Sequence, residues 1–151
     1  MITIEELKKK ISNKSRLMGL DVGKKRIGVS ICDENRLVAT PFKLIIKDNF
    51  QKLLNDIKII VDEYNIKGII IGNPINMDGT LGPSAQSVKD ISILLSKNIT
   101  VPIILWDERL STKGAYNLSS QLDIKAAKKK QSIDKNAATF ILQGAIDYLN
   151  N

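Results

Sequence analysis

The sequence contains no histidine and only one cysteine. A Ser-His-Asp triad and a Cys-His nucleophile pair are therefore both excluded. An internal disulfide and a zinc site built from several cysteines are excluded as well. Cys32 lies inside an apolar segment, where we expect a buried structural thiol rather than a reactive one. Acid–base or metal chemistry in this chain must therefore rest mainly on carboxylates.

Aromatic residues and long apolar runs are also scarce. Phe, Tyr and Trp make up 5% of the chain, which argues against a protein that binds single strands by stacking bases on exposed rings. No apolar run approaches the roughly 20 residues that span a bilayer, and Lys8-Lys9-Lys10 interrupts the segment where a signal peptide would be apolar. We therefore expect a protein of the reducing cytoplasm with no membrane partner.

Positive charge is in excess, with 23 Lys and Arg against 16 Asp and Glu and a net charge of +7. A polyanion such as nucleic acid is the natural partner of this surplus, although solvated lysine faces would give the same composition. The length of 151 residues fits one domain, and a hydrophobic fraction of 43% with few aromatics predicts an aliphatic α/β core.

Short apolar segments alternate with amphipathic ones along the chain. We expect residues 1–15 to form an N-terminal helical extension, with a helix from Thr3 to Ile11, and residues 16–151 to form a single domain. The domain should contain three strands, a helix, a strand, a helix, a strand and two helices. The predicted strands are 17–22, 27–32, 37–46, 68–72 and 101–106, and the predicted helices cover 50–64 and begin near Pro83, Thr112 and Asp134.

Turns and prolines predict how these strands pair. The first three strands are joined by short turns and should form an antiparallel meander. The fourth and fifth follow helices and should be parallel to their neighbours, through right-handed crossovers. Pro41 and Pro102 place the third and fifth strands at the two edges of the sheet. We therefore predict one mixed five-stranded sheet of order 3-2-1-4-5 with helices on both faces.

Three carboxylates stand where such a sheet would carry a ligand. Asp21 ends the first strand, Glu108 follows the fifth, and Asp134 is near the start of the last helix. Ligand sites gather at the carboxyl ends of parallel strands, so these side chains could meet at one edge. Their charges would repel unless a divalent cation joined them, and oxygen ligands favour Mg²⁺ or Mn²⁺. This pattern suits two-metal phosphodiester hydrolysis, with the ions about 4 Å apart.

Each carboxylate also has a plain structural interpretation. Asp21 could be an ordinary turn residue before Gly23, and Glu108 could be a surface residue paired with Arg109. Asp134 could simply cap its helix. No single carboxylate is specific, and the hypothesis of a site depends on three of them at one predicted edge.

Cations accompany the carboxylates in two groups, one directly after Asp21 and one in the basic segment 123–132, which we expect to be a mobile loop before the last helix. We predict that these cations contact phosphates, while the alternative for the second group is a solvated loop. A polar side chain and a further cation are expected at the same edge. The predicted nucleic-acid contacts are Lys24, Lys25, Arg26, Asn73, Arg109, Lys128, Lys129 and Lys130.

Four segments in order resemble motifs of the YqgF/RuvX family, whose members are described as Holliday-junction resolvases or pre-16S rRNA nucleases. The first runs Asp-Val-Gly-Lys-Lys-Arg-Ile-Gly-Val-Ser from Asp21. The second is the Gly-Asn-Pro-Ile-Asn-Met-Asp-Gly loop within 71–80, and the third is Asp-Glu-Arg-Leu-Ser-Thr within 106–112. The fourth is the basic segment with its following Asp helix, 128–138. The resemblance covers residues 17–149.

The resemblance implies a ribonuclease H-like fold and a metal-dependent nuclease that acts through Asp21, Glu108 and Asp134. It points to maturation of the 5′ end of precursor 16S rRNA, with ribosomal particles as a further partner. Junction resolution on branched DNA is the nearest variant and would favour a two-fold dimer. The sequence has no obvious dimerisation stripe, so we expect a monomer or weak dimer.

Two other functions fit part of the pattern. A non-catalytic RNA- or ribosome-binding module would use the cations and need no metal. A sugar-kinase-like ATP site would use the Asp-x-Gly turn, but those enzymes duplicate the fold, and 151 residues are too few for two copies.

Overall fold

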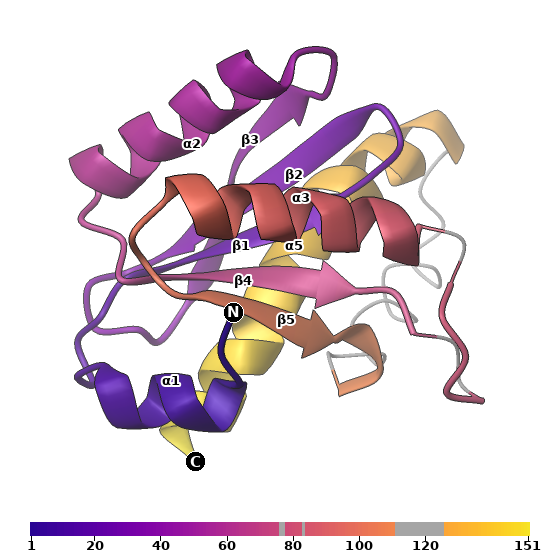
Figure 1. The fold of residues 1–151 in the computed structure, drawn as a ribbon. Coiled ribbons are helices and arrows are strands. Elements are labelled where there is room, and N and C mark those ends of the chain that lie inside the picture. Colours follow the sequence, from indigo (N-terminus) through magenta and orange to yellow (C-terminus); the bar gives the residue numbers. More distant parts are fainter. Residues whose placement is uncertain (76–77, 83, 111–125) are drawn as a thin grey trace.

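The computed structural model describes residues 1–75, 78–82, 84–110 and 126–151, and only the backbone of 126–135. Five strands form one mixed sheet of order β3-β2-β1-β4-β5 (Figure 1). The pairs β1–β2 and β2–β3 are antiparallel, whereas β1–β4 and β4–β5 are parallel. The predicted meander and strand order are confirmed. The strands are β1 (Leu17–Val22), β2 (Arg26–Cys32), β3 (Ala39–Ile46), β4 (Gly68–Asn73) and β5 (Ile103–Asp107).

Helices cover both faces of the sheet, as predicted (Figure 1). On one face lie α2 (Phe50–Glu63) and α3 (Ala85–Asn98). Across the other face runs α5 (Ala126–Asn150), with α1 (Ile4–Lys10) beside its C-terminal end. A single 3₁₀ turn, η1 (Glu108–Leu110), follows β5 directly. The described helices include none with the length and apolar character that crossing a bilayer requires.

The strands divide the core into two clusters because successive side chains point to opposite faces of a sheet. Met18, Leu20 and Val22 of β1 belong to the cluster under α2 and α3. Leu17, at the start of the same strand, belongs to the cluster under α5, and so does Cys32, the buried thiol predicted from the sequence. This alternation decides which polar residues near the strand ends share a face.

Helix α5 lies directly on β1, because Gly19 has no side chain to separate them. A Cβ atom placed on Gly19 would lie 2.7 Å from Cβ of Leu142 and 2.8 Å from the carbonyl oxygen of Ala138. The Ser30 hydroxyl, on neighbouring β2, donates a hydrogen bond of 2.7 Å to that same carbonyl. A close approach of this kind needs glycine, and the buried hydroxyl fixes the helix along its own axis.

The N-terminal helix belongs to the same layer as α5. Thr3 caps it by accepting a hydrogen bond from the N–H of Glu6. Leu7 is fully buried in the cluster under α5. The N–H of Ile2 donates to the carbonyl of Ile103 on the edge strand β5. The division into an extension and a domain stays a prediction.

The last helix begins earlier than the sequence suggested. Its first residue is Ala126, so Asp134 lies inside the helix, and the interpretation of Asp134 as a cap is wrong. The part of the basic segment from Ala126 to Ser132 is helix rather than loop. The physical reason is that Ala, Lys and Gln, which dominate this stretch, are strong helix formers. The helix predicted from Thr112 lies outside the described residues.

The third strand begins at Ala39 instead of residue 37, because the turn before it is longer than expected. One carboxylate oxygen of Asp33 accepts hydrogen bonds from the N–H groups of both Leu37 and Val38, at 2.8 and 2.7 Å. These bonds hold both residues in the turn. Pro41 lies in β3 at the sheet edge, where the pairing register with β2 shifts, as its missing N–H requires.

Candidate functional site

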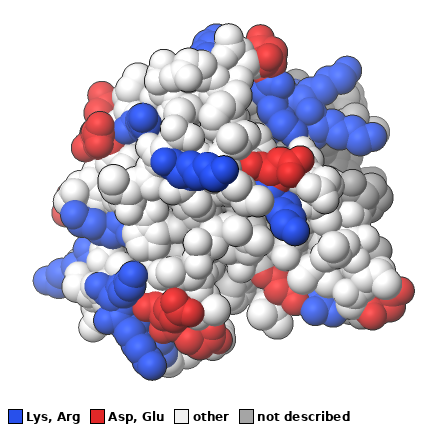
Figure 2. Space-filling model, viewed as in Figure 1, with Lys and Arg blue, Asp and Glu red and all other residues white. Residues whose placement is uncertain are grey.

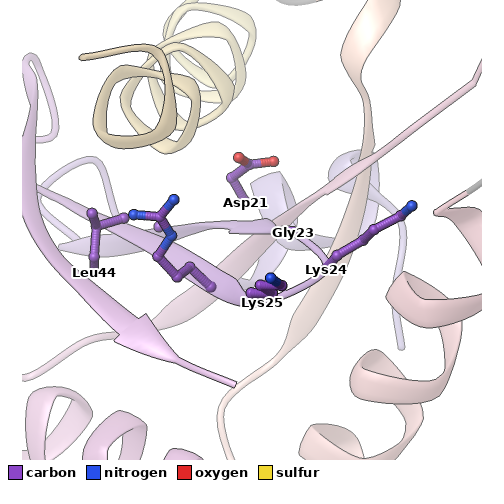
Figure 3. Close-up of a pocket in the computed structure, with 7 residues that line it drawn as sticks. Asp21, Gly23, Lys24, Lys25 and Leu44 are labelled. Atoms are coloured by element: carbon purple, nitrogen blue, oxygen red, sulfur yellow. The ribbon is translucent and has the colours of Figure 1, made fainter. Parts of the chain in front are cut away.

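Asp21 lies near the end of β1, on the face of the sheet that α5 covers. It follows Gly19 by two residues, so the two share a face. Figure 3 shows its carboxylate directed to the side of the sheet where α5 lies, while Lys24 extends away from it. The side chain is half-buried. The predicted position of this carboxylate at a strand end is therefore confirmed.

Glu108 reaches across β4 toward Asp21. The β1–β4 register pairs Leu20 with Ile71, so Gly72 is the β4 residue beside Asp21. A Cβ atom placed on Gly72 would lie only 2.6 Å from Oε1 of Glu108, so the Glu108 carboxylate occupies the space over Gly72. The two carboxylates come from strands that are not adjacent, and Gly72 lies between them.

The charges of this site act on one another. Burial, together with the negative charges of Asp21 and Asp107, raises the pKa of Glu108 from its usual 4.5 to about 7. Burial is the larger cause, and the contribution of Asp21 shows that its charge is near enough to oppose ionisation of Glu108. Two carboxylates in such proximity are an unfavourable arrangement unless a cation or a proton compensates their charge.

Arg109 pairs with Asp107 instead of Glu108. Its Nη2 lies 2.7 Å from Oδ2 of Asp107, and its backbone N–H donates to Oδ1 at 3.0 Å. These hydrogen bonds lower the pKa of Asp107. The interpretation of Glu108 as a surface residue paired with Arg109 is therefore wrong.

Asp134 is the third predicted ligand, and its side chain lies outside the described part of the chain. Asp134 lies about one helical turn before Ala138 in the sequence, and Ala138 packs on β1. Among the described residues, no group of three or more His, Cys, Asp or Glu could hold a metal ion. The described part thus supplies two carboxylates of the predicted three, and the role of Asp134 stays a prediction.

Cations adjoin Asp21, as expected from the sequence. A pocket of about 380 Å³ lies at the turn between β1 and β2. Basic side chains also gather over this turn on the molecular surface (Figure 2). An approaching phosphate would therefore meet positive charge directly beside the carboxylate. The pocket is lined by Asp21, Gly23, Lys24, Lys25, Arg26, Gly28 and Leu44.

Lys47, which follows β3, fixes this turn and was missed by the sequence analysis. Its backbone N–H donates to the carbonyl of Lys25 at 2.8 Å. Its Nζ donates to the carbonyl of Gly23 at 3.3 Å and to the hydroxyl of Ser87 on α3 at 2.6 Å. One residue therefore holds both sides of the basic turn and ties it to α3. A lone lysine after a strand gives no signal of this role in the sequence.

Of the other predicted nucleic-acid contacts, Asn73 and Arg109 do not line the pocket that contains Asp21. Asn73 pairs with Asp107 in the β4–β5 ladder, and strand alternation places it on the face opposite Gly72. Arg109 is engaged with Asp107. Lys128, Lys129 and Lys130 lie in the part of α5 whose side chains are outside the described residues. Contact of all five with nucleic acid stays a prediction.

A mixed sheet of order 3-2-1-4-5 with helices on both faces defines the class of ribonuclease H-like folds, and here carboxylates from the ends of β1 and β5 lie on one face of it. Two solved structures of RuvC from Thermus thermophilus share this fold. The one in complex with Holliday junction substrate has a TM-score of 0.56 and 10% identity, over 89% of this chain and 94% of that chain. The other has a TM-score of 0.55 and 11% identity, over 88% and 95%.

Sequence similarity narrows the class. The family model "RuvX: Holliday junction resolvase" matches residues 15–148. A protein of Pelagibacter ubique (strain HTCC1062) named as a pre-16S rRNA nuclease is 62% identical over 151 residues, which is 100% of both chains. A protein of the same name from Desulfitobacterium hafniense (strain DSM 10664 / DCB-2) is 44% identical, over 89% of this chain and 93% of its own. The chain belongs to the RuvX family of nucleases, which are hydrolases that act on ester bonds.

Proposed function

We propose that the protein is a divalent-metal-dependent nuclease that hydrolyses phosphodiester bonds in structured nucleic acid, and that it processes the 5′ end of precursor 16S rRNA. The observation that carries the proposal is the position of Glu108, which extends from the end of β5 over Gly72 to the vicinity of Asp21. The expected metal ligands are Asp21, Glu108 and Asp134.

The residues fit a hard divalent cation. The donors are carboxylate oxygens, which favour Mg²⁺ or Mn²⁺. Burial, and after it the charges of Asp21 and Asp107, raise the pKa of Glu108, and a bound cation would stabilise its charged form. When bound, such an ion polarises a phosphoryl oxygen and makes water a stronger nucleophile.

The basic turn would hold the nucleic acid. Lys24, Lys25 and Arg26 line the pocket that contains Asp21, so phosphates bound by these cations would lie beside the carboxylate. Lys47 keeps this turn in place through the carbonyls of Gly23 and Lys25. The turn thus positions the phosphate backbone, and the carboxylates define where cleavage occurs.

The choice of precursor rRNA rests on the names of relatives that match the chain over nearly its whole length. We propose that the protein acts in the cytoplasm, on ribosomal particles that carry the precursor, as a monomer or weak dimer. Holliday junction resolution is the second candidate, because the family description and a structural neighbour both name that substrate. A non-catalytic RNA-binding module is the third, since the basic turn itself requires no metal.

The test compares cleavage of a precursor 16S rRNA fragment, a four-way DNA junction and a linear duplex in the presence of Mg²⁺. We expect the wild-type protein to cut the precursor RNA in preference to either DNA. Asp21→Asn should lower the rate roughly 100-fold or more, because it removes charge that holds the ion. Single-turnover cleavage on sequencing gels gives both the rate and the position of the cut.

Asp62→Asn is the matched control, because Asp62 is an exposed carboxylate near the C-terminal end of α2, at the opposite end of the sheet from Asp21, and its rate should equal that of wild type. Equal cleavage by wild type and Asp21→Asn would remove the catalytic assignment. Preferred cleavage of the junction would support resolution instead. Tight RNA binding without cleavage by the wild-type protein would support the binding module.

A further inference from the structure

We infer that Gly72 is a positioning residue of the candidate metal site: because it lacks a side chain, Glu108 can reach across β4 to Asp21. The consequence of this role for metal binding rests on the proposed function. The geometric part of the inference concerns only the proximity of the two carboxylates, which Gly72 separates. It assigns to a strand glycine a role that neither its conformation nor its burial in the sheet would indicate.

The sheet geometry makes Gly72 the critical position. Residues 68, 70 and 72 of β4 face α5, and Ile70 fills its place in the core with a large, fully buried side chain. Beside Gly72 on β5 is Trp106, which is buried in the same cluster. A side chain at position 72 would fill the space between Trp106 and Asp21. The Glu108 carboxylate occupies that space instead.

A second feature directs Glu108 to this space. The chain leaves β5 in the 3₁₀ turn η1, which begins at Glu108 itself. The Asp107 carboxylate accepts hydrogen bonds from both the backbone and the guanidinium of Arg109, and so fixes the residues on either side. Because its neighbours are fixed, the Glu108 side chain lies on the face of the sheet that carries Gly72. The 3₁₀ turn sets the direction of this side chain, and Gly72 leaves the space that it occupies.

A methyl group at position 72 would meet only side-chain atoms, those of Glu108 and Ile141. Its carbon would lie 2.6 Å from Oε1 of Glu108 and 2.5 Å from Cδ1 of Ile141 on α5. No backbone atom is among these nearest neighbours, so the sheet need not move. The Glu108 carboxylate must then leave its place near Asp21. Ile141→Val removes Cδ1, and the Cγ1 atom that remains at 3.1 Å needs to shift by only a few tenths of an ångström, so the main displacement falls on Glu108.

The experiment measures the coupling between the two carboxylates in metal-free protein. Melting temperatures of Asp21→Asn, Glu108→Gln and the double variant are compared near pH 8, first in the wild-type background and then in Gly72→Ala/Ile141→Val. In the wild-type background, either single change by itself relieves the repulsion between Asp21 and Glu108. The two increases in melting temperature should therefore sum to more than the increase seen in the double variant. In the Gly72→Ala/Ile141→Val background, Glu108 no longer lies near Asp21, so the two changes in melting temperature should be additive. Calorimetry with Mn²⁺ should show an affinity loss of about tenfold or more.

The controls are Ile141→Val alone and Gly68→Ala. The latter makes the same substitution on the same face of β4, where its nearest contacts are Leu17 and Leu7 at 3.1 and 3.3 Å. Both controls should keep the coupling and the Mn²⁺ affinity of wild type. Glu108→Asp shortens the reach in the unaltered fold, and it should also lose coupling and affinity.

Undiminished coupling in Gly72→Ala/Ile141→Val, or in Glu108→Asp, would overturn the inference. If Gly72→Ala/Ile141→Val does not fold, the same cycle is run in Gly72→Ala/Ile141→Ala, which also removes the Cγ1 atom at 3.1 Å. The thermal cycle needs no metal, so it tests the role of Gly72 even if the wild-type protein neither binds Mn²⁺ nor cleaves RNA. That last result would overturn the proposed function, and the thermal cycle would still show whether Gly72 lets Glu108 lie near Asp21.

Discussion

Asp107 and Glu108 are neighbours in sequence, but the fold shifts their pKa in opposite directions. The hydrogen bond from Arg109 lowers the pKa of Asp107, so this carboxylate stays charged. Burial and the charge of Asp21 raise the pKa of Glu108 to about 7. Carboxylates with such different environments have different tasks. Asp107 shapes the turn after β5, and Glu108 is the one poised to gain from a cation.

The raised pKa of Glu108 predicts how the stability of metal-free protein depends on pH. Between its ordinary value of 4.5 and about 7, the folded protein binds this proton more tightly than the unfolded chain. The free energy of unfolding should therefore fall as pH rises through this window. Glu108→Gln removes the effect. After discounting for solvent screening, we expect the variant to be more stable than wild type by about 1–2 kcal/mol near pH 8, with no difference near pH 4.5.

Urea unfolding across this pH range measures the difference. Asp62→Asn should follow the wild-type curve, because Asp62 is exposed near the C-terminal end of α2, at the opposite end of the sheet from the site. Addition of Mg²⁺ should stabilise wild type more than Glu108→Gln, because the variant lacks a ligand. Identical pH curves for wild type and Glu108→Gln would show that Glu108 is not held near Asp21.

At the scale of elements, the turn between β1 and β2 depends on β3 and α3. The turn is closed by a hydrogen bond of 2.9 Å from the N–H of Gly23 to the carbonyl of Arg26. Lys47 adds bonds to Gly23, Lys25 and Ser87, so the end of β3 and α3 together hold the turn in place. A basic turn held in this way loses less conformational entropy when it binds a phosphate backbone.

Lys47→Met should therefore weaken substrate binding without changing the chemical step. Loss of the Nζ hydrogen bonds frees the turn, and we expect KM for RNA to rise about fivefold, or roughly 1 kcal/mol, with kcat unchanged. Steady-state kinetics at fixed salt give both constants. Lys43→Met is the control, since Lys43 lies exposed on β3, and only the loss of its charge is tested. A drop in kcat without a change in KM would contradict this role for Lys47.

At the scale of the whole molecule, Arg36 joins three parts of the chain that are distant in sequence. This buried residue of the β2–β3 turn donates to the carbonyl of Ser12 and, through two nitrogens, to Oδ1 of Asn150 at the end of α5. The side-chain amide of Asn150 in turn donates to the Arg36 carbonyl. The bonds hold α5 against the sheet at the end opposite to Asp21.

Arg36→Ala should lower the free energy of unfolding by about 2–4 kcal/mol, because it breaks a buried network with charged hydrogen bonds. Activity per folded molecule should be unchanged, since the network is remote from the carboxylates. Urea titration measures the loss. Glu34→Ala in the same turn should cost less than about 0.5 kcal/mol, because its ion pair with Arg16 is long and exposed. Equal losses for the two variants would contradict the importance of the Arg36 network.

Much of the architecture could be predicted because its signals are local. Apolar periodicity located the strands and the amphipathic helices, and Pro41 and Pro102 identified both edges of the sheet. The start of the last helix was misplaced because charge was taken as a sign of a loop, although Ala and Lys favour helix. The position of Asp21 followed from the end of an apolar run, which is again a local feature.

The sequence by itself determined the order of the strands, the aliphatic core and the presence of carboxylates at strand ends. Only the tertiary structure decided that Glu108 lies over Gly72 near Asp21, that Arg109 turns to Asp107, and that Lys47 holds the basic turn. The physical reason is the distance along the chain over which each kind of interaction acts. Periodicity and propensity act over a few residues, whereas these contacts join elements brought together by packing, and a missing side chain matters only once its neighbours are in place.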